Sequence, residues 1–302
     1  MKPEISPEQL PTVFTYHPEY WDYVDRFTKW HGAPFPDSPI LSKSLRTITD
    51  HRNKFRTLAD RANLLIPEIV EERKLLNQTG YSNCDKVREF TAIIETLVCE
   101  IYSCLDGLRD AIHSIYENVR GVQKKSTGTL FKKAAEESYG EGFPLEIATL
   151  LKAAYESWFI KLRELRSELT HGNLGICSMQ DEEKIVYIHH GISLGKQPLI
   201  IDDIIAWLNT NINQVNVLLN DICKFWFNQL EPREVLENCG IHKGRFMGRV
   251  IMITEPIDQD SGLCIFRHFY EEYPEFACPI KDSCAAYARV GSNSREVVER
   301  LQ

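Results

Sequence analysis

Arg166 and His171, five positions apart, are the residues whose types and spacing point most clearly at chemistry. The guanidinium of arginine is permanently charged and presents a planar fork that matches phosphate oxygens. The imidazole of histidine gains and loses a proton near neutral pH. Together they supply what phosphodiester cleavage needs without a metal ion. A neutral His171 would take the proton of a ribose 2′-OH, and Arg166 would stabilise the phosphate under attack, with roughly 10²–10⁴-fold gained from the general base.

The surrounding residues place this pair near the end of an amphipathic helix. Arg166 follows Leu162 by one turn, so it lies on the flank of the apolar stripe with its stem against the core. Because Gly172 suits the position after a helix end, helical order need not extend through His171. The imidazole can then turn back toward the guanidinium. The alternative is structural, since a histidine in the last turn also stabilises the helix dipole by ~0.3–1 kcal/mol.

The stretch Leu162-Arg-Glu-Leu-Arg-Ser-Glu-Leu-Thr-His-Gly172 resembles the Arg-x(4–6)-His motif helix of HEPN domains, the "higher eukaryotes and prokaryotes nucleotide-binding" family. The likeness covers roughly residues 40–230. Ser167 stands where the family commonly has Asn, Asp or His. The resemblance implies a helical bundle, a homodimer in which two motifs meet, and metal-independent RNA cleavage that leaves a 2′,3′-cyclic phosphate. It also implies a toxin or defence setting.

Further cations are candidates for phosphate contacts. Arg163 lies one turn before Arg166 and is an accessory candidate together with Ser167, although Arg163 would also suit a surface ion pair. The connector from residue 120 to 133 carries five basic residues and no acid. Within it, Lys124 and Lys125 are expected to contact phosphates, unless the segment is simply a solvated basic loop. It lacks the Gly-x4-Gly-Lys order of a nucleotide-binding P-loop.

The cysteines and histidines of the C-terminal part do not predict a metal site. Zinc needs four ligands, usually in closely spaced pairs, and only Cys239 and His242 have near-typical spacing. The nine cysteines are scattered, and several fall in apolar helical runs, which is typical of reduced thiols in a core. We therefore expect no metal, no cofactor and a cytoplasmic protein.

Composition restricts the class of protein further. Of 302 residues, 43% are hydrophobic and 26% charged, which is ordinary for a globular protein. The net charge of −8 argues against a general nucleic-acid coat protein but allows a local phosphate site. No apolar run is long enough for a membrane span, and the first residues lack the apolar run of a signal peptide. No membrane partner is therefore expected.

Four segments have apolar residues in alternating steps of three and four, which predicts long helices. They are residues 41–78, 86–119, 145–170 and 201–229. The Ile66–Pro67 step is expected to kink or divide the first of them. A short helix is expected at 129–139. Helices with one apolar stripe bury it best against each other, which predicts a helical bundle.

Shorter elements complete the expected organisation. Residues 1–38, rich in proline and aromatic residues, are expected to form an irregular arm packed on the main body. Residues 39–230 would form the HEPN-like bundle, with a β-hairpin inserted between 174 and 192. Residues 231–302 would form a small α+β extension with strands at 245–254 and 262–270. The fold class is thus mainly α.

Three functions remain open from the sequence. The first is a metal-independent endoribonuclease that uses Arg166 and His171 on RNA. The second is a non-catalytic HEPN-like module for dimerisation or nucleotide binding. The third is a helical scaffold whose C-terminal extension contacts a protein partner.

Overall fold

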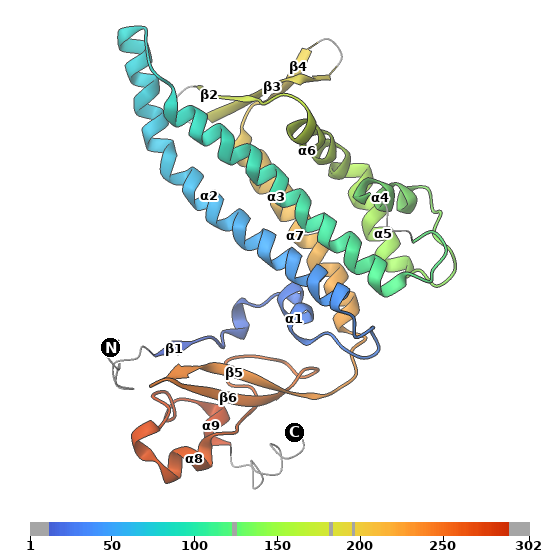
Figure 1. Cartoon of the computed structure of the whole chain (residues 1–302), viewed down its shortest axis with the longest axis vertical. Coiled ribbons are helices and arrows are strands. Elements are labelled where there is room, and N and C mark those ends of the chain that lie inside the picture. The colour runs from blue at the N-terminus through green and yellow to red at the C-terminus, as the bar shows by residue number, and fades with distance from the viewer. Residues whose placement is uncertain (1–11, 123–125, 181–183, 195–196, 290–302) are drawn as a thin grey trace, which may run out of the picture. The chain divides into compact units, whose positions relative to one another are not determined.

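The computed structural model describes residues 12–122, 126–180, 184–194 and 197–289 (Figure 1). The chain divides into two compact units. One runs from Phe35 to Phe225, and the other joins the two ends of the chain, up to Pro34 and from Trp226 onward. This division differs from the expected arm, bundle and extension, because the N-terminal segment belongs with the C-terminal one.

The first unit is a bundle of long helices. They are α2 (Pro39–Thr79), α3 (Asp85–Tyr116), α5 (Leu145–Ala154) with its continuation α6 (Ile160–His171), and α7 (Ile204–Phe227). The chain runs along α2, returns in α3, runs back through α5 and α6, and returns again in α7 (Figure 1). Short α4 (Thr127–Ala135) precedes α5. The predicted mainly helical fold with small antiparallel sheets is confirmed.

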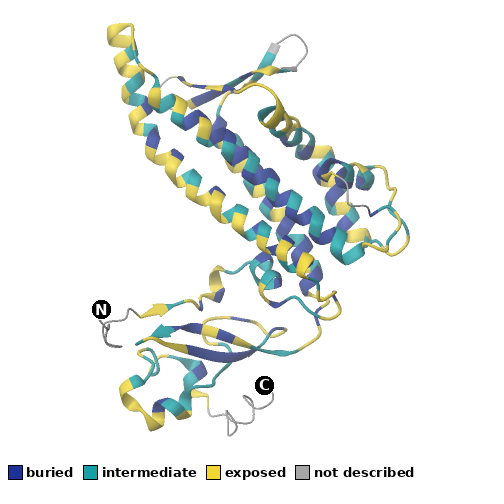
Figure 2. Cartoon of the chain, viewed as in Figure 1, coloured by how far each residue is buried: buried dark blue, intermediate teal, exposed yellow. Residues whose placement is uncertain are grey.

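The apolar stripes of these helices form the core (Figure 2). The apolar positions predicted for the middle of α3 are buried. None of Ile94, Leu97, Ile101 and Leu108 is more than 2% exposed. The helix α2 is not divided at Pro67, which lies inside it.

A π-helical turn, η3 (Tyr155–Phe159), joins α5 to α6. The sequence pattern places Trp158 in the stripe, but the structure buries Phe159 instead. A π turn adds one residue to the helix repeat, so the buried positions step by five from Ala154 to Phe159 and the downstream face rotates. Phe159 stacks on Phe131 of α4, with ring centroids 3.9 Å apart.

A three-stranded antiparallel sheet replaces the expected hairpin at one end of the bundle. It consists of β2 (Ile176–Gln180), β3 (Lys184–Leu194) and β4 (Gln197–Ile201), in that order. The predicted strand at Lys184–His189 lies in β3. The third strand was not predicted. It contains Pro198, which an edge strand such as β4 tolerates.

The second unit contains a four-stranded antiparallel sheet in the order β1-β5-β6-β7. Its elements are β1 (Val13–Phe14), η2 (Pro18–Tyr20), α1 (Tyr23–Trp30), β5 (Glu234–His242), β6 (Arg245–Met252), β7 (Leu263–Cys264), α8 (Arg267–Glu272), η4 (Pro274–Phe276) and α9 (Ala285–Ala288). Lys243 and Gly244 form the turn between β5 and β6, both with positive φ, as the tightest hairpins require.

Two expectations for this unit are corrected, and one strand is added to it. The arm is not irregular throughout, because Asp22 caps α1 by accepting a hydrogen bond from the Asp25 backbone N–H. Strand β5 was not predicted. The expected strand at 262–270 is short, and α8 takes up its second half.

In the described part of the chain, no helix has the length and apolar character needed to cross a bilayer.

Candidate functional site

Arg166 lies on α6 against α3 and is half-buried. Its guanidinium carbon is 5.0 Å from the centre of the Tyr102 ring, a cation–π contact. Its Nε is buried and has no hydrogen-bond partner among the described residues. A buried donor without an acceptor costs about 1–3 kcal/mol, so an acceptor brought by a ligand would find a favourable partner here.

Arg163 lies on the same face of α6, one turn earlier, and approaches the first turn of α4. A Cβ built on Gly128 would lie 3.1 Å from both Cδ and Nη1 of Arg163, so the missing side chain makes room for the arginine. Burial raises the pKa of the Tyr102 phenol and Asp106 raises it further, whereas Arg166 and Arg163 oppose both effects. The two arginines therefore act electrostatically on one ring of α3.

The nearby acids are committed to other partners. Asp106 accepts hydrogen bonds from the Thr127 hydroxyl and, at 3.0 Å, from Nη1 of Arg109. Asp110 accepts a hydrogen bond of 2.9 Å from Nε of Arg109. Of the ion pairs formed within the described ranges, none includes Arg163 or Arg166. The α6 arginines therefore carry positive charge that no described carboxylate neutralises.

His171 is exposed and is the last residue of α6. Helical order, which Gly172 would have allowed to end before His171, extends through it. Five residues of α-helix turn the side-chain direction by about 140° relative to the start. Arg166 faces Tyr102, and no contact among the described residues joins its side chain to His171. The motif is therefore not a preassembled pair within one chain.

The exit from the motif helix is held by Glu168 and His189. The Asn173 backbone N–H donates to the Glu168 carboxylate at 3.3 Å. The fully buried His189 ring lies 2.7 Å from the Asn173 carbonyl oxygen through Nε2, and its Nδ1 accepts a 3.2 Å hydrogen bond from the Gly191 N–H. This histidine thereby ties the end of α6 to β3.

The other predicted contacts are distributed differently. Ser167 is exposed on α6. Lys124 and Lys125 lie outside the described residues. Sequence reasoning missed Tyr102, since a tyrosine in an apolar stripe does not show which helix it will face. Thr127, a further candidate phosphate contact of the basic connector, donates its hydroxyl to Asp106.

Two of the C-terminal cysteines, Cys239 and Cys284, contact a buried arginine. Arg249 is 1% exposed, its Nε donates to the Cys239 sulfur at 3.1 Å, and its guanidinium lies 4.1 Å from the centre of the Tyr16 ring. Burial raises the pKa of Cys239, and Arg249 opposes this effect. No group of His, Cys, Asp and Glu side chains within the described ranges is arranged to hold a metal ion.

No protein-family model matches the chain, and neither the curated proteins nor the solved structures gave a match. The arguments for function therefore come from the residues themselves.

Proposed function

We propose that the chain binds the phosphates of RNA or of a nucleotide through Arg166 and Arg163, as a HEPN-like helical module. The observation that carries the proposal is the pair of half-buried arginines that have no acidic partner among the described residues, where one of them also has a buried Nε–H without an acceptor. Phosphate oxygens offer the acceptors and the negative charge that the described residues do not supply to these two arginines. The protein is acidic overall, so we expect binding to depend on this local charge.

Equilibrium binding of a fluorescently labelled single-stranded RNA tests the proposal. Arg166→Ala should weaken binding by about tenfold or more, since hydrogen bonds between charged groups contribute roughly 1.5–3 kcal/mol. Arg163→Ala should weaken it less. Arg56→Ala removes an exposed arginine on α2 and is the matched control, expected to bind like the wild type. Affinity should fall as salt rises.

Either of two results contradicts this proposal. One is equal binding by the wild type and Arg166→Ala at the same salt concentration. The other is no affinity for RNA or nucleoside phosphates at any salt concentration, which favours a helical scaffold that contacts a protein partner.

A second candidate function is metal-independent endoribonuclease activity, which the exposure of His171 favours. Within one chain Arg166 and His171 do not meet, so this function requires the histidine of one copy to reach the phosphate held by the other. A homodimer, as the HEPN resemblance implies, would supply that arrangement. His171 would then remove the 2′-OH proton, and the 2′-oxygen would displace the 5′-oxygen from phosphorus.

RNA incubation in EDTA, with the product ends mapped, separates the two functions. Cleavage by the wild type that leaves cyclic phosphate ends, and its loss in His171→Ala with RNA binding retained, would support the enzyme. Binding without cleavage would leave the phosphate-binding module as the function.

A further inference from the structure

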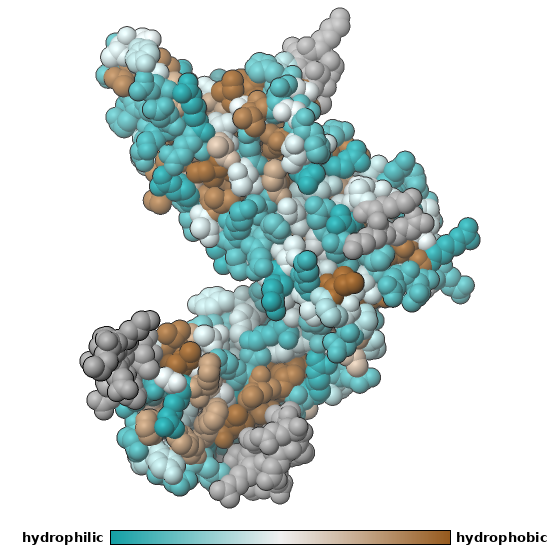
Figure 3. Space-filling model, in the orientation of Figure 1, coloured by the Kyte–Doolittle hydropathy of each residue, from teal (hydrophilic) through white to brown (hydrophobic). Residues whose placement is uncertain are grey.

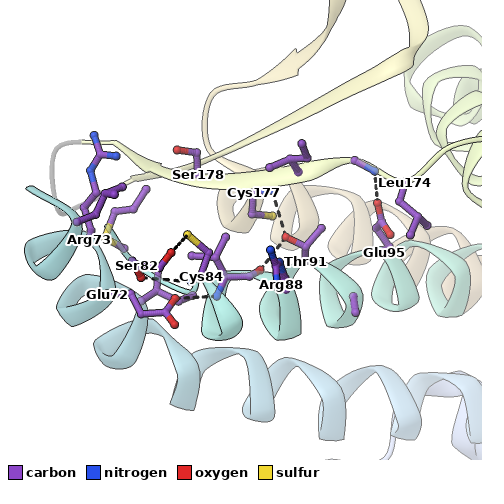
Figure 4. Close-up of a pocket in the computed structure, with 17 residues that line it drawn as sticks. Glu72, Arg73, Ser82, Cys84, Arg88, Thr91, Glu95, Leu174, Cys177 and Ser178 are labelled. Carbon is purple, nitrogen blue, oxygen red and sulfur yellow. Dashed lines mark hydrogen bonds between the residues drawn. The ribbon is translucent and has the colours of Figure 1, made fainter. Parts of the chain in front are cut away.

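A pocket of about 590 Å³ lies between the C-terminal half of α2, the start of α3 and strand β2, away from the arginines of α6 (Figure 4). Its walls are mainly apolar, and hydrophobic side chains also gather on the surface of this region (Figure 3). The apolar lining residues are Ile69, Leu76, Val87, Ala92, Leu174, Ile176 and Met179. This volume is typical of sites that bind small molecules.

The free edge of β2 is already covered on this side. The Glu95 carboxylate accepts hydrogen bonds from the Gly175 N–H at 2.6 Å and from the Tyr187 hydroxyl at 2.9 Å. The Thr91 hydroxyl accepts one from the Cys177 N–H at 3.1 Å. Thr91 and Glu95 are four residues apart on the helix, a rise of about 6 Å, and Gly175 and Cys177 are two residues apart along the strand, a rise of about 6.6 Å. The spacing of the two acceptors therefore matches the spacing of the two N–H donors. The pocket is therefore no slot for an added strand.

The second acid of the lining is also occupied. Glu72 reaches from α2 to the start of α3, where its carboxylate accepts hydrogen bonds from the backbone N–H groups of Lys86 at 2.9 Å and Val87 at 3.2 Å. The N-terminus of a helix attracts a negative charge. The carboxylates of Glu72 and Glu95 thus both accept hydrogen bonds from within the protein.

The two arginines of the lining are less engaged with the rest of the described residues than the carboxylates are. Arg73 is exposed and takes part in no ion pair among the described residues. The Arg88 side chain is 77% exposed, and the one ion pair it forms within the described ranges is a 3.8 Å contact with Asp85. Figure 4 shows Arg73 at one end of the pocket and Glu95 at the other. Among the described residues, the pocket therefore combines an apolar wall with two exposed guanidinium groups, while its two carboxylates accept hydrogen bonds from neighbouring backbone and hydroxyl groups.

We propose that this pocket binds a small amphiphilic anion, an unbranched alkyl chain with a carboxylate head group. The chain would cover Leu174 and Ile176, which are 71% and 55% exposed. The head group would lie between Arg73 and Arg88. A cationic amphiphile would fit the same walls but bring its charge beside the two exposed guanidinium groups, and a neutral one would gain only the apolar contacts. This site is independent of the phosphate-binding face of α6.

Displacement of anilinonaphthalenesulfonate fluorescence by dodecanoate, kept below its micelle concentration, tests the proposal. Dodecanoate should displace the dye, and dodecyltrimethylammonium should require higher concentrations. The double variant Arg73→Ala/Arg88→Ala should weaken dodecanoate binding by about fivefold, the scale of two exposed charge contacts. Arg56→Ala, an exposed arginine of α2 outside the lining, should bind like the wild type.

Alkylation of Cys84 by N-ethylmaleimide locates the ligand, because this half-buried thiol lines the pocket. Bound dodecanoate should slow labelling of Cys84, measured by mass spectrometry of the peptide. Ile176→Asp, at an exposed position, should abolish this protection while thermal unfolding stays cooperative.

Three results would overturn the proposal. They are no dodecanoate binding, equal binding of the cationic amphiphile, and binding that leaves the Cys84 labelling rate unchanged. Co-sedimentation with phosphatidylglycerol vesicles distinguishes the source of the alkyl chain, since vesicle binding without dodecanoate binding would favour a membrane surface.

Discussion

The thiol of Cys104 shows how burial sets the chemistry of a single residue. The residue is fully buried on α3, and burial raises the pKa of its thiol to about 12. Such a thiol is neutral at ordinary pH and does not act as a nucleophile. Cys177, whose pKa burial also raises to about 12, is in the same state. Both cysteines therefore serve packing, Cys104 in the apolar stripe of α3 and Cys177 on the buried face of β2.

This burial predicts a pH dependence of stability. Between pH 9 and 12 the unfolded chain loses the Cys104 proton while the folded chain keeps it, so the free energy of unfolding falls as pH rises. At pH 10 the loss is on the order of 1 kcal/mol for this thiol. Cys104→Ala has no thiol to titrate, so its free energy of unfolding does not fall in this way. The difference in unfolding free energy between the wild type and this variant should therefore be smaller at pH 10 than at pH 8, as measured by urea unfolding.

The neighbouring variant Leu105→Ala is the matched control for Cys104→Ala. Leu105 is fully buried on the same helix and has no titrating group. Because Leu105→Ala keeps the Cys104 thiol, its loss of unfolding free energy relative to the wild type should be the same at the two pH values. Equal narrowing in both variants would assign the effect to other groups.

At the scale of the element, the start of α3 depends on a side chain from another helix. Its own N-cap residue, Cys84, has the left-handed φ of 55° and makes no side-chain cap. Glu72 of α2 supplies the acceptors instead. Glu72→Ala should lower the free energy of unfolding by about 0.5–2 kcal/mol, as for other lost caps. Urea unfolding followed by circular dichroism measures it.

Glu71→Ala is the control for this capping prediction. Glu71 is exposed and pairs with Lys74 one turn away on the surface, at 2.9 Å, so its removal should cost only a few tenths of a kcal/mol. Equal costs for the two variants would argue against the interhelical cap.

The helices could be predicted from the sequence where one pattern holds throughout, as in α3. The α5–α6 segment shows the limit. Its two halves are each periodic, but a single extra residue in the π turn moves burial from Trp158 to Phe159. Stripe patterns contain no signal for that residue. The candidate site is limited in the same way. Arg166 and its helix could be predicted from the sequence, but the orientation of α6 that places Arg166 against Tyr102 could not.

At the scale of the whole molecule, the N-terminal segment completes a unit whose other part lies about two hundred residues later in sequence. Strand β1 pairs with β5, and the Tyr16 hydroxyl donates to the Asp258 carbonyl at 3.1 Å. Trp30 donates from Nε1 to the Glu237 carboxylate at 2.7 Å, and Lys29 forms an ion pair with it. A proline-rich start predicts irregular chain, but partners so distant in sequence leave no local pattern.

The buried carboxylate of Glu237 makes this unit sensitive to one change in the N-terminal segment. Glu237 is 3% exposed, so Trp30→Phe removes a donor where water has little access. The cost should be about 1–3 kcal/mol of unfolding free energy. Because the two units are separately compact, we expect protease sensitivity to rise within residues 12–34 and 226–289. Residues 35–225 should resist digestion as in the wild type.

Limited proteolysis with mass mapping of the fragments measures this prediction. Tyr20→Phe, at a side chain that is 80% exposed, is the control and should leave the digestion pattern unchanged. If Trp30→Phe instead sensitised both units equally, the two would unfold together, and the ends of the chain would support the bundle as well as each other. If it sensitised neither, the hydrogen bond from Trp30 would be dispensable, leaving the Lys29 ion pair to hold the buried carboxylate.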